Sequence, residues 1–139
     1  MASSPATRFL APAIPWLEPQ PLVDQLELGP GLDTASFRNA LVVLARQSQV
    51  QARVALGSRA RGDARLDSDL DLAVICREPN LKPAEKNQRS FGYRQLLGPV
   101  GCGVDLVVVG AADAQHLAGS RWHVMGDVAR EGRVLYVSG

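Results

Sequence analysis

The chain has 139 residues, of which 46% are hydrophobic and 21% charged, and its formal net charge at pH 7 is +1. This length and composition predict one globular domain with a modest core. The nearly balanced charge gives no general attraction to nucleic acid or acidic membranes, so we expect neither direct nucleic-acid binding nor membrane association. No run of about 18 apolar residues is present, and prolines interrupt residues 1–15, where a secretory signal needs a continuous apolar stretch. We therefore expect a cytoplasmic protein.

Residues 1–33 form a Pro-rich N-terminal extension without helical or strand periodicity. The extension also contains large apolar residues, among them Trp16, Leu26 and Leu28. It could pack onto its own domain, dock onto a partner or be partly disordered, and the sequence leaves these alternatives open. We expect residues 34–139 to form the folded domain.

After residue 33, helical and strand periodicities alternate along the chain. Asp33 has the side chain and position of a helix N-cap. The predicted helices cover 34–49, 59–65, 84–97, part of 110–119, and 120–130, and the predicted strands cover 53–56, 69–76, 104–109 and 133–137. This order predicts an α/β (α+β) fold, a single small domain in which helices flank a mixed central sheet of about four strands.

Two of the helices carry apolar residues that we expect to face the core. In the helix at 84–97 these are Phe91, Leu96 and Leu97. In the helix at 120–130 they are Trp122, Met125 and Val128.

The most informative segment begins with Gly57-Ser58 and continues to the acidic pair Asp69 and Asp71. Residues i and i+2 of a strand point to the same face, so the two carboxylates would lie side by side. Such a pair repels unless a cation lies between its members, and oxygen ligands of this kind suit Mg²⁺. The Gly-Ser turn can present backbone N–H groups and a hydroxyl to a phosphate. Together these features indicate chemistry on a nucleoside triphosphate.

A third acid, Asp105, is embedded in the apolar strand at 104–109. An isolated carboxylate in such a strand is costly unless it is paired or bound to metal. If this strand lies beside the one at 69–76, three carboxylates converge, which is sufficient for a site with two metal ions. The alternative is an Asp that caps a backbone amide at the start of the strand.

Positive charge for a nucleotide is available beside the motif from Arg59, Arg61 and Arg65, although these residues could also form a solvated helix face. Arg61 could contact phosphate or brace the acidic residues. Ser68 could hold the loop before the acidic strand, or form an ordinary turn through its hydroxyl.

At these positions the sequence resembles the DNA polymerase beta-like nucleotidyltransferase superfamily, whose pattern is Gly-Ser, then Asp-x-Asp, then a distal Asp on a neighbouring strand. The longer run from Gly57 to Leu72 resembles the minimal nucleotidyltransferase (MNT) subgroup, and the resemblance covers about residues 36–137. It implies that the catalytic residues bind two Mg²⁺ ions and that further residues contact ATP. The implied catalytic and metal-binding residues are Asp69, Asp71 and Asp105, and the implied nucleotide-binding residues are Gly57, Ser58, Arg59, Arg61 and Ser68.

The resemblance also implies a role for the protein. Stand-alone minimal members resemble the antitoxin of a toxin–antitoxin pair, which transfers AMP from ATP to a tyrosine of a HEPN-family ribonuclease toxin. Larger members carry additional domains that bind the acceptor, and this sequence shows none, so we expect an acceptor site that is either shallow or completed by another chain. Two alternatives stay open, namely a nucleotidyltransferase that modifies a small molecule such as an aminoglycoside, and an antitoxin that occludes its partner without catalysis.

Overall fold

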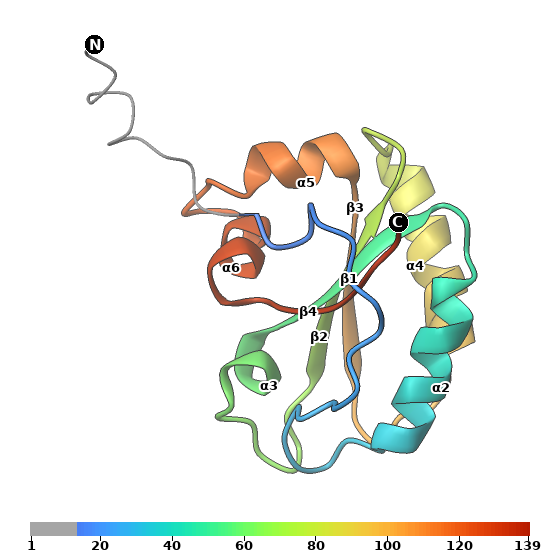
Figure 1. Ribbon diagram of the computed structural model, residues 1–139, viewed down its shortest axis with the longest axis vertical. Helices are drawn as coiled ribbons and strands as arrows, with labels where there is room; N and C mark the ends of the chain where they lie inside the picture. Colours follow the sequence, from blue (N-terminus) through green and yellow to red (C-terminus); the bar gives the residue numbers. More distant parts are fainter. Residues whose placement is uncertain (1–13) are drawn as a thin grey trace.

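The computed structural model describes residues 14–139, which fold around one four-stranded sheet (Figure 1). The strand order is β3-β2-β1-β4. Strand β1 pairs antiparallel with β2 and with β4, whereas β2 and β3 are parallel, so the sheet is mixed as predicted. The strands are β1 (Val50–Leu56), β2 (Leu70–Cys76), β3 (Val104–Gly110) and β4 (Arg133–Val137).

Helices cover both faces of this sheet, and Figure 1 shows α2 and α4 on one side and α5 and α6 on the other. Three of them differ by two or more residues from the predicted ranges. The short helix predicted at 59–65 lies at 57–61. The helix predicted to reach residue 49 ends at Ala45, because β1 begins at Val50. The helix predicted from residue 120 begins at Val124. The helices are α2 (Thr34–Ala45), α3 (Gly57–Arg61), α4 (Pro83–Leu97), α5 (Ala111–Leu117) and α6 (Val124–Glu131).

The ends of α2 and α6 show why these helices begin where they do. Asp33 is the N-cap of α2, as predicted, and its carboxylate accepts a hydrogen bond from the Ser36 amide at 3.1 Å. His123 is the N-cap of α6, where its Nδ1 accepts a hydrogen bond from the Met125 amide at 3.1 Å. This histidine therefore has a structural role.

Alternation along β2 separates two apolar cores, one on each face of the sheet. Leu70, Leu72 and Val74 pack into the core beneath α2 and α4. Ala73 and Ile75 pack into the second core, beneath α5 and α6. Asp71 is two residues before Ala73 in the same strand, so its side chain lies on the same face of the sheet as the second core.

Residues 14–33 pack onto the same two cores. Trp16 is 1% exposed within the second core, whereas Leu28, also 1% exposed, lies in the first. The segment also covers the outer edge of β4, because the Gln20 amide donates to the Val137 carbonyl at 3.0 Å and the Val23 amide to the Leu135 carbonyl at 3.1 Å. Of the alternatives that the sequence left open, the structure shows residues 14–33 packed onto their own domain. Residues 1–13 lie outside the described part of the chain.

Three residues expected in the core are exposed instead. Phe91 is 66% exposed and Leu96 38%, while Tyr93 and Leu97 face the core from α4. Trp122 is 94% exposed, because it precedes α6 and does not share the face of Met125. Within the described range 14–139, no helix combines the length and apolarity that a membrane span requires.

Candidate active site

The two acidic strands begin side by side in the sheet. In the parallel ladder between β2 and β3, Asp71 is the direct partner of Asp105, so both side chains lie on the same face. Asp69 stands one residue before β2, outside the regular strand predicted to contain it. The Leu70 amide donates to the Gly103 carbonyl at 2.8 Å, which joins the two strands just before the acids. The sheet therefore brings the three predicted acids to one end.

The Gly57-Ser58 turn lies directly beside Asp71. Leu56, the last residue of β1, pairs with Asp71, and α3 begins at the next residue. Gly57 has φ +74°, and a Cβ at this position would clash with Oδ2 of Asp71. Only glycine combines this backbone conformation with so close an approach of the carboxylate. The turn and the acids are thus parts of one site.

The electrostatics of the site disfavour a charged Asp71. Burial raises the pKa of its carboxyl group above the usual range, and the negative charges of Asp105 and Asp69 raise it further. The positive charge of Arg61 opposes these effects. Because Asp69 and Asp105 are exposed and Asp71 is half-buried, the acids face a surface that a ligand can reach.

Arg61 is near this cluster but is paired with other acids. Its Nε lies 3.6 Å from Asp63 and its Nη1 lies 3.5 Å from Glu131, and all three side chains are about half exposed. Exposed pairs of this kind are weak. Arg61 is therefore free to exchange these partners for a phosphate, and Glu131 is a residue of the site that sequence reasoning missed.

Arg59 is in a different position from the one predicted. Its side chain is fully buried, and its Nε and both terminal nitrogens donate to backbone carbonyls. The short bonds reach Leu28 (2.9 Å), Pro30 (2.7 Å) and Ser68 (2.7 Å). A guanidinium that is occupied in this way cannot also bind a nucleotide, so we remove Arg59 from the proposed nucleotide-binding residues.

Ser68 holds the loop that leads to the acids. Its Oγ accepts a hydrogen bond from the Arg65 amide at 2.8 Å, and its own amide donates to the Arg65 carbonyl at 3.1 Å. This arrangement agrees with the turn that the sequence left open. A contact between Ser68 and a nucleotide stays a prediction.

Gly103 is a second residue of the site that sequence reasoning missed. A Cβ here would lie 2.5 Å from Oδ1 of Asp69, so glycine allows the Asp69 carboxylate to lie against the start of β3. The sequence did contain a signal for this contact, because Gly103 lies two residues before Asp105 in an apolar strand, and a glycine in a strand often marks a close approach of another group to the backbone.

The donor chemistry of the site fits a divalent cation. Asp71 and Asp105 are neighbouring carboxylates whose mutual repulsion a cation would relieve, and carboxylate oxygens suit Mg²⁺. Among residues 14–139, however, no three His, Cys, Asp or Glu side chains converge closely enough to form a complete metal cluster. That all three acids bind metal therefore stays a prediction.

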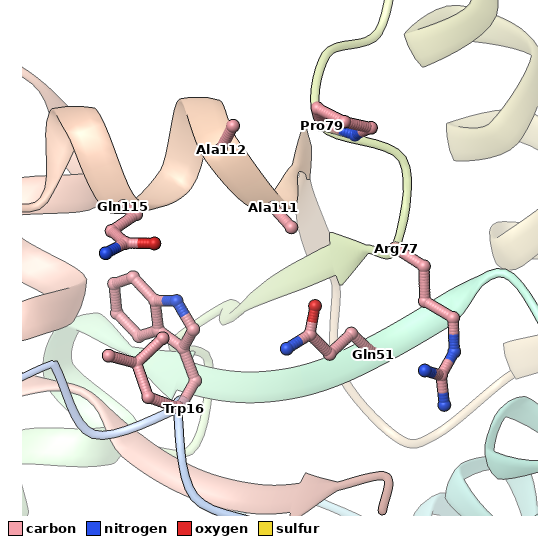
Figure 2. A pocket seen from close by; sticks show the side chains of 8 residues that line it. Trp16, Gln51, Arg77, Pro79, Ala111, Ala112 and Gln115 are labelled. Carbon is pink, nitrogen blue, oxygen red and sulfur yellow. The ribbon is translucent and has the colours of Figure 1, made fainter.

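A separate pocket of about 220 Å³ lies at the other end of the sheet. Figure 2 shows Trp16 and Gln51 on one side of it and α5, with Gln115, on the other. Arg77 follows the last residue of β2 and Ala111 follows the last residue of β3, whereas the acids lie at or before the first residues of these strands. This pocket is therefore distinct from the acidic site.

Comparison with known families agrees with this geometry. The family model described as polymerase beta, nucleotidyltransferase matches residues 39–137. The chain belongs to the polymerase beta-type nucleotidyltransferase family. Nucleotidyltransferases generally use a nucleoside triphosphate and a divalent metal, and the neighbouring carboxylates of the acidic site suit the metal.

Two solved structures are similar to this nucleotidyltransferase. A crystal structure of a toxin–antitoxin with AMP-PNP is 22% identical, with a TM-score of 0.47, over 72% of this chain and 73% of that chain. A structure described as a minimal nucleotidyltransferase is 34% identical, with a TM-score of 0.44, over 72% of this chain and 89% of that chain. No curated protein matched the chain.

Proposed function

We propose that this nucleotidyltransferase is an antitoxin that transfers AMP from ATP to a hydroxyl group, most simply a tyrosine, of a HEPN-family ribonuclease toxin. The observation that carries the transferase chemistry is the pairing of Asp71 with Asp105 beside the Gly57 turn. The toxin as acceptor comes from the resemblance of the motif to minimal nucleotidyltransferases.

Each residue of the site has a part in this proposal. Gly57 and Ser58 bind the triphosphate through backbone and hydroxyl, and Arg61 leaves Glu131 to neutralise phosphate charge. A divalent cation held by the acidic residues would supply further positive charge beside the triphosphate. Asp69 and Asp71 are its proposed ligands together with Asp105.

Asp105 is also the proposed base, because it is exposed at the end of the sheet where an acceptor can approach. The acceptor oxygen forms a bond to the α-phosphorus of ATP, while the bond from that phosphorus to the pyrophosphate oxygen breaks. The hydroxyl proton passes to the Asp105 carboxylate. Positioning and charge neutralisation supply the acceleration, as expected for this class of reaction.

The decisive experiment is intact-mass analysis of the protein and its genomic neighbour after incubation with Mg²⁺ and ATP. We expect the neighbour to gain one or more AMP units. The double variant Asp69→Asn/Asp71→Asn should abolish the gain. Asp127→Asn is a matched control, because Asp127 is an exposed acid on α6 whose recorded partner is Arg130.

The remaining outcomes separate the alternatives. Modification by GTP, CTP or UTP in place of ATP would keep the transferase and change its nucleotide. A stable complex that gains no mass with any nucleotide would refute the proposed catalysis and indicate occlusion. Mass transfer to aminoglycosides, with none to the neighbouring protein, would identify a small-molecule enzyme.

A further inference from the structure

Residues 28–33, which we call the strap, lie between the two loops that lead into the acidic strands. Loop 62–69 precedes β2, and loop 98–103 precedes β3. The strap contacts the first loop closely, because a Cβ at Gly31, which has φ +89°, would clash with the Leu66 carbonyl. It contacts the second loop through a 2.7 Å hydrogen bond from the Asp33 amide to the Val100 carbonyl.

A second close contact fixes the strap against loop 98–103. A Cβ at Gly101 would lie 2.8 Å from the Gly31 carbonyl oxygen and 2.9 Å from the Asp33 nitrogen. The strap is anchored at its beginning by Leu28, which is 1% exposed in the first core. Backbone therefore packs on backbone at both loops, which leaves little freedom for either loop to shift.

Arg59 joins the strap to loop 62–69. Its Nη1 donates to the carbonyls of Leu28 and Pro30 on the strap, and its Nε and Nη2 donate to the carbonyl of Ser68. Ser68 immediately precedes Asp69, so the guanidinium holds the backbone next to a proposed metal ligand. A planar fork with five N–H donors can make these bonds together, whereas a lysine ammonium cannot reach them in the same geometry.

We propose that the strap and Arg59 set the spacing between Asp69 and Asp105, with Arg59 as a positioning residue for the acidic site. This inference rests on the proposed function for its consequence in catalysis. The strap lies outside residues 39–137, the range of the family model, so this part of the site is not assigned by membership of the family. Without the strap, both loops would lose the backbone contacts that hold them in place.

The experiment compares two variants of the strap with two matched controls. Arg59→Met removes the buried fork, and Gly31→Ala introduces the clash with Leu66. Arg53→Met is the control for the first, because Arg53 is equally buried but donates to the Leu44 carbonyl at the end of α2. Gly119→Ala is the control for the second, because Gly119 lies outside both loops and an added Cβ there meets no atom of the described residues within 4 Å.

The first measurement is amide hydrogen exchange of the metal-free protein, at a temperature where every variant is folded. We expect faster exchange in both loops of Arg59→Met and Gly31→Ala, and unchanged exchange there in the controls. Loop 98–103 is the critical segment, because no recorded hydrogen bond of Arg59 reaches it. Faster exchange in that loop of Arg59→Met means that the strap transmits the change.

The second measurement is calorimetric binding of Mn²⁺ in the presence of a non-hydrolysable ATP analogue. We expect affinity to fall about tenfold in the strap variants, the loss typical when support for a metal ligand is removed, and to stay unchanged in the controls. Arg59→Lys should recover part of the affinity, and it replaces Arg59→Met if the latter does not fold.

The outcomes distinguish this inference from the proposed function. If exchange changes only in loop 62–69, or if the strap variants lose melting temperature but bind Mn²⁺ normally, the inference is wrong. If wild-type protein transfers no AMP while both loops respond to the strap variants, the proposed function fails and the positioning of the loops stands.

Discussion

Trp16 provides the strongest test that residues 14–33 are part of the fold. Its side chain is 1% exposed and packs in the second core, so Trp16→Ala removes most of an aromatic surface of about 200 Å² from the interior. At about 25 cal/mol per Å² this area corresponds to about 5 kcal/mol. Measured Trp→Ala changes in cores cost about 3–5 kcal/mol. We expect a loss of about 4 kcal/mol in the free energy of unfolding.

Urea denaturation followed by circular dichroism measures this loss directly, and thermal unfolding should show a melting temperature lower by roughly 10 °C. Leu17→Ala is the matched control, because the neighbouring side chain is 49% exposed and should cost no more than about 0.5 kcal/mol. A loss below about 1 kcal/mol in Trp16→Ala would refute the reasoning, since the segment would then contribute little to the core.

Three further predictions concern single residues. Gly57→Ala should lower the rate of AMP transfer about a hundredfold, because the new Cβ displaces Asp71, and a rate within threefold of wild type would contradict the close approach. Asp33→Ala should lower the melting temperature at pH 7, because hydrogen bonds from Ser36 hold the pKa of this carboxyl below its ordinary 3.8. The stabilising effect of Asp33 is therefore present above pH 3.8 and is lost as the pH falls through the lowered pKa. A difference in melting temperature between wild type and variant that is equal at pH 7 and at pH 2 would argue against the cap. Arg53→Met should leave the free energy of unfolding unchanged or raise it by up to about 3 kcal/mol, because two nitrogens of this buried guanidinium have no hydrogen-bond partner among residues 14–139 and burial lowers its pKa to about 10. A loss above about 2 kcal/mol in urea denaturation would show that the contacts of Arg53 with the Leu44 carbonyl and the Tyr136 ring matter more than the cost of its burial.

The sheet was predictable because its signals are local. The alternation around Asp71 and the apolar run around Asp105 each identify a strand, and the predicted 133–137 strand matches β4. The proximity of the acids followed from one assumption, that the two strands are neighbours, and the parallel ladder between β2 and β3 confirms it.

The errors arose where distant segments decide the environment of a residue. Arg59 has the sequence context of a solvated helix, yet carbonyls of residues 28 and 30 bury it from a segment about 30 positions away. Trp122 looked like a core residue at helical spacing with Met125, but α6 begins after it. The sequence could not show that residues 14–33 pack on both cores, because irregular backbone carries no periodicity to detect.

The hydrogen bonds that join Arg59 to the strap and to loop 62–69 have a consequence for how this protein can change during evolution. Its acceptors are main-chain oxygens, which every residue type supplies, so the identities of Pro30, Arg65 and Ser68 are not fixed by the guanidinium. Related chains could therefore keep the same hydrogen bonds while residues 30, 65 and 68 change, provided that an arginine at position 59 and a glycine at position 31 are retained. Sequence comparison would then show only the retained arginine and glycine, whereas the carbonyl groups that the arginine binds are seen in the structure alone.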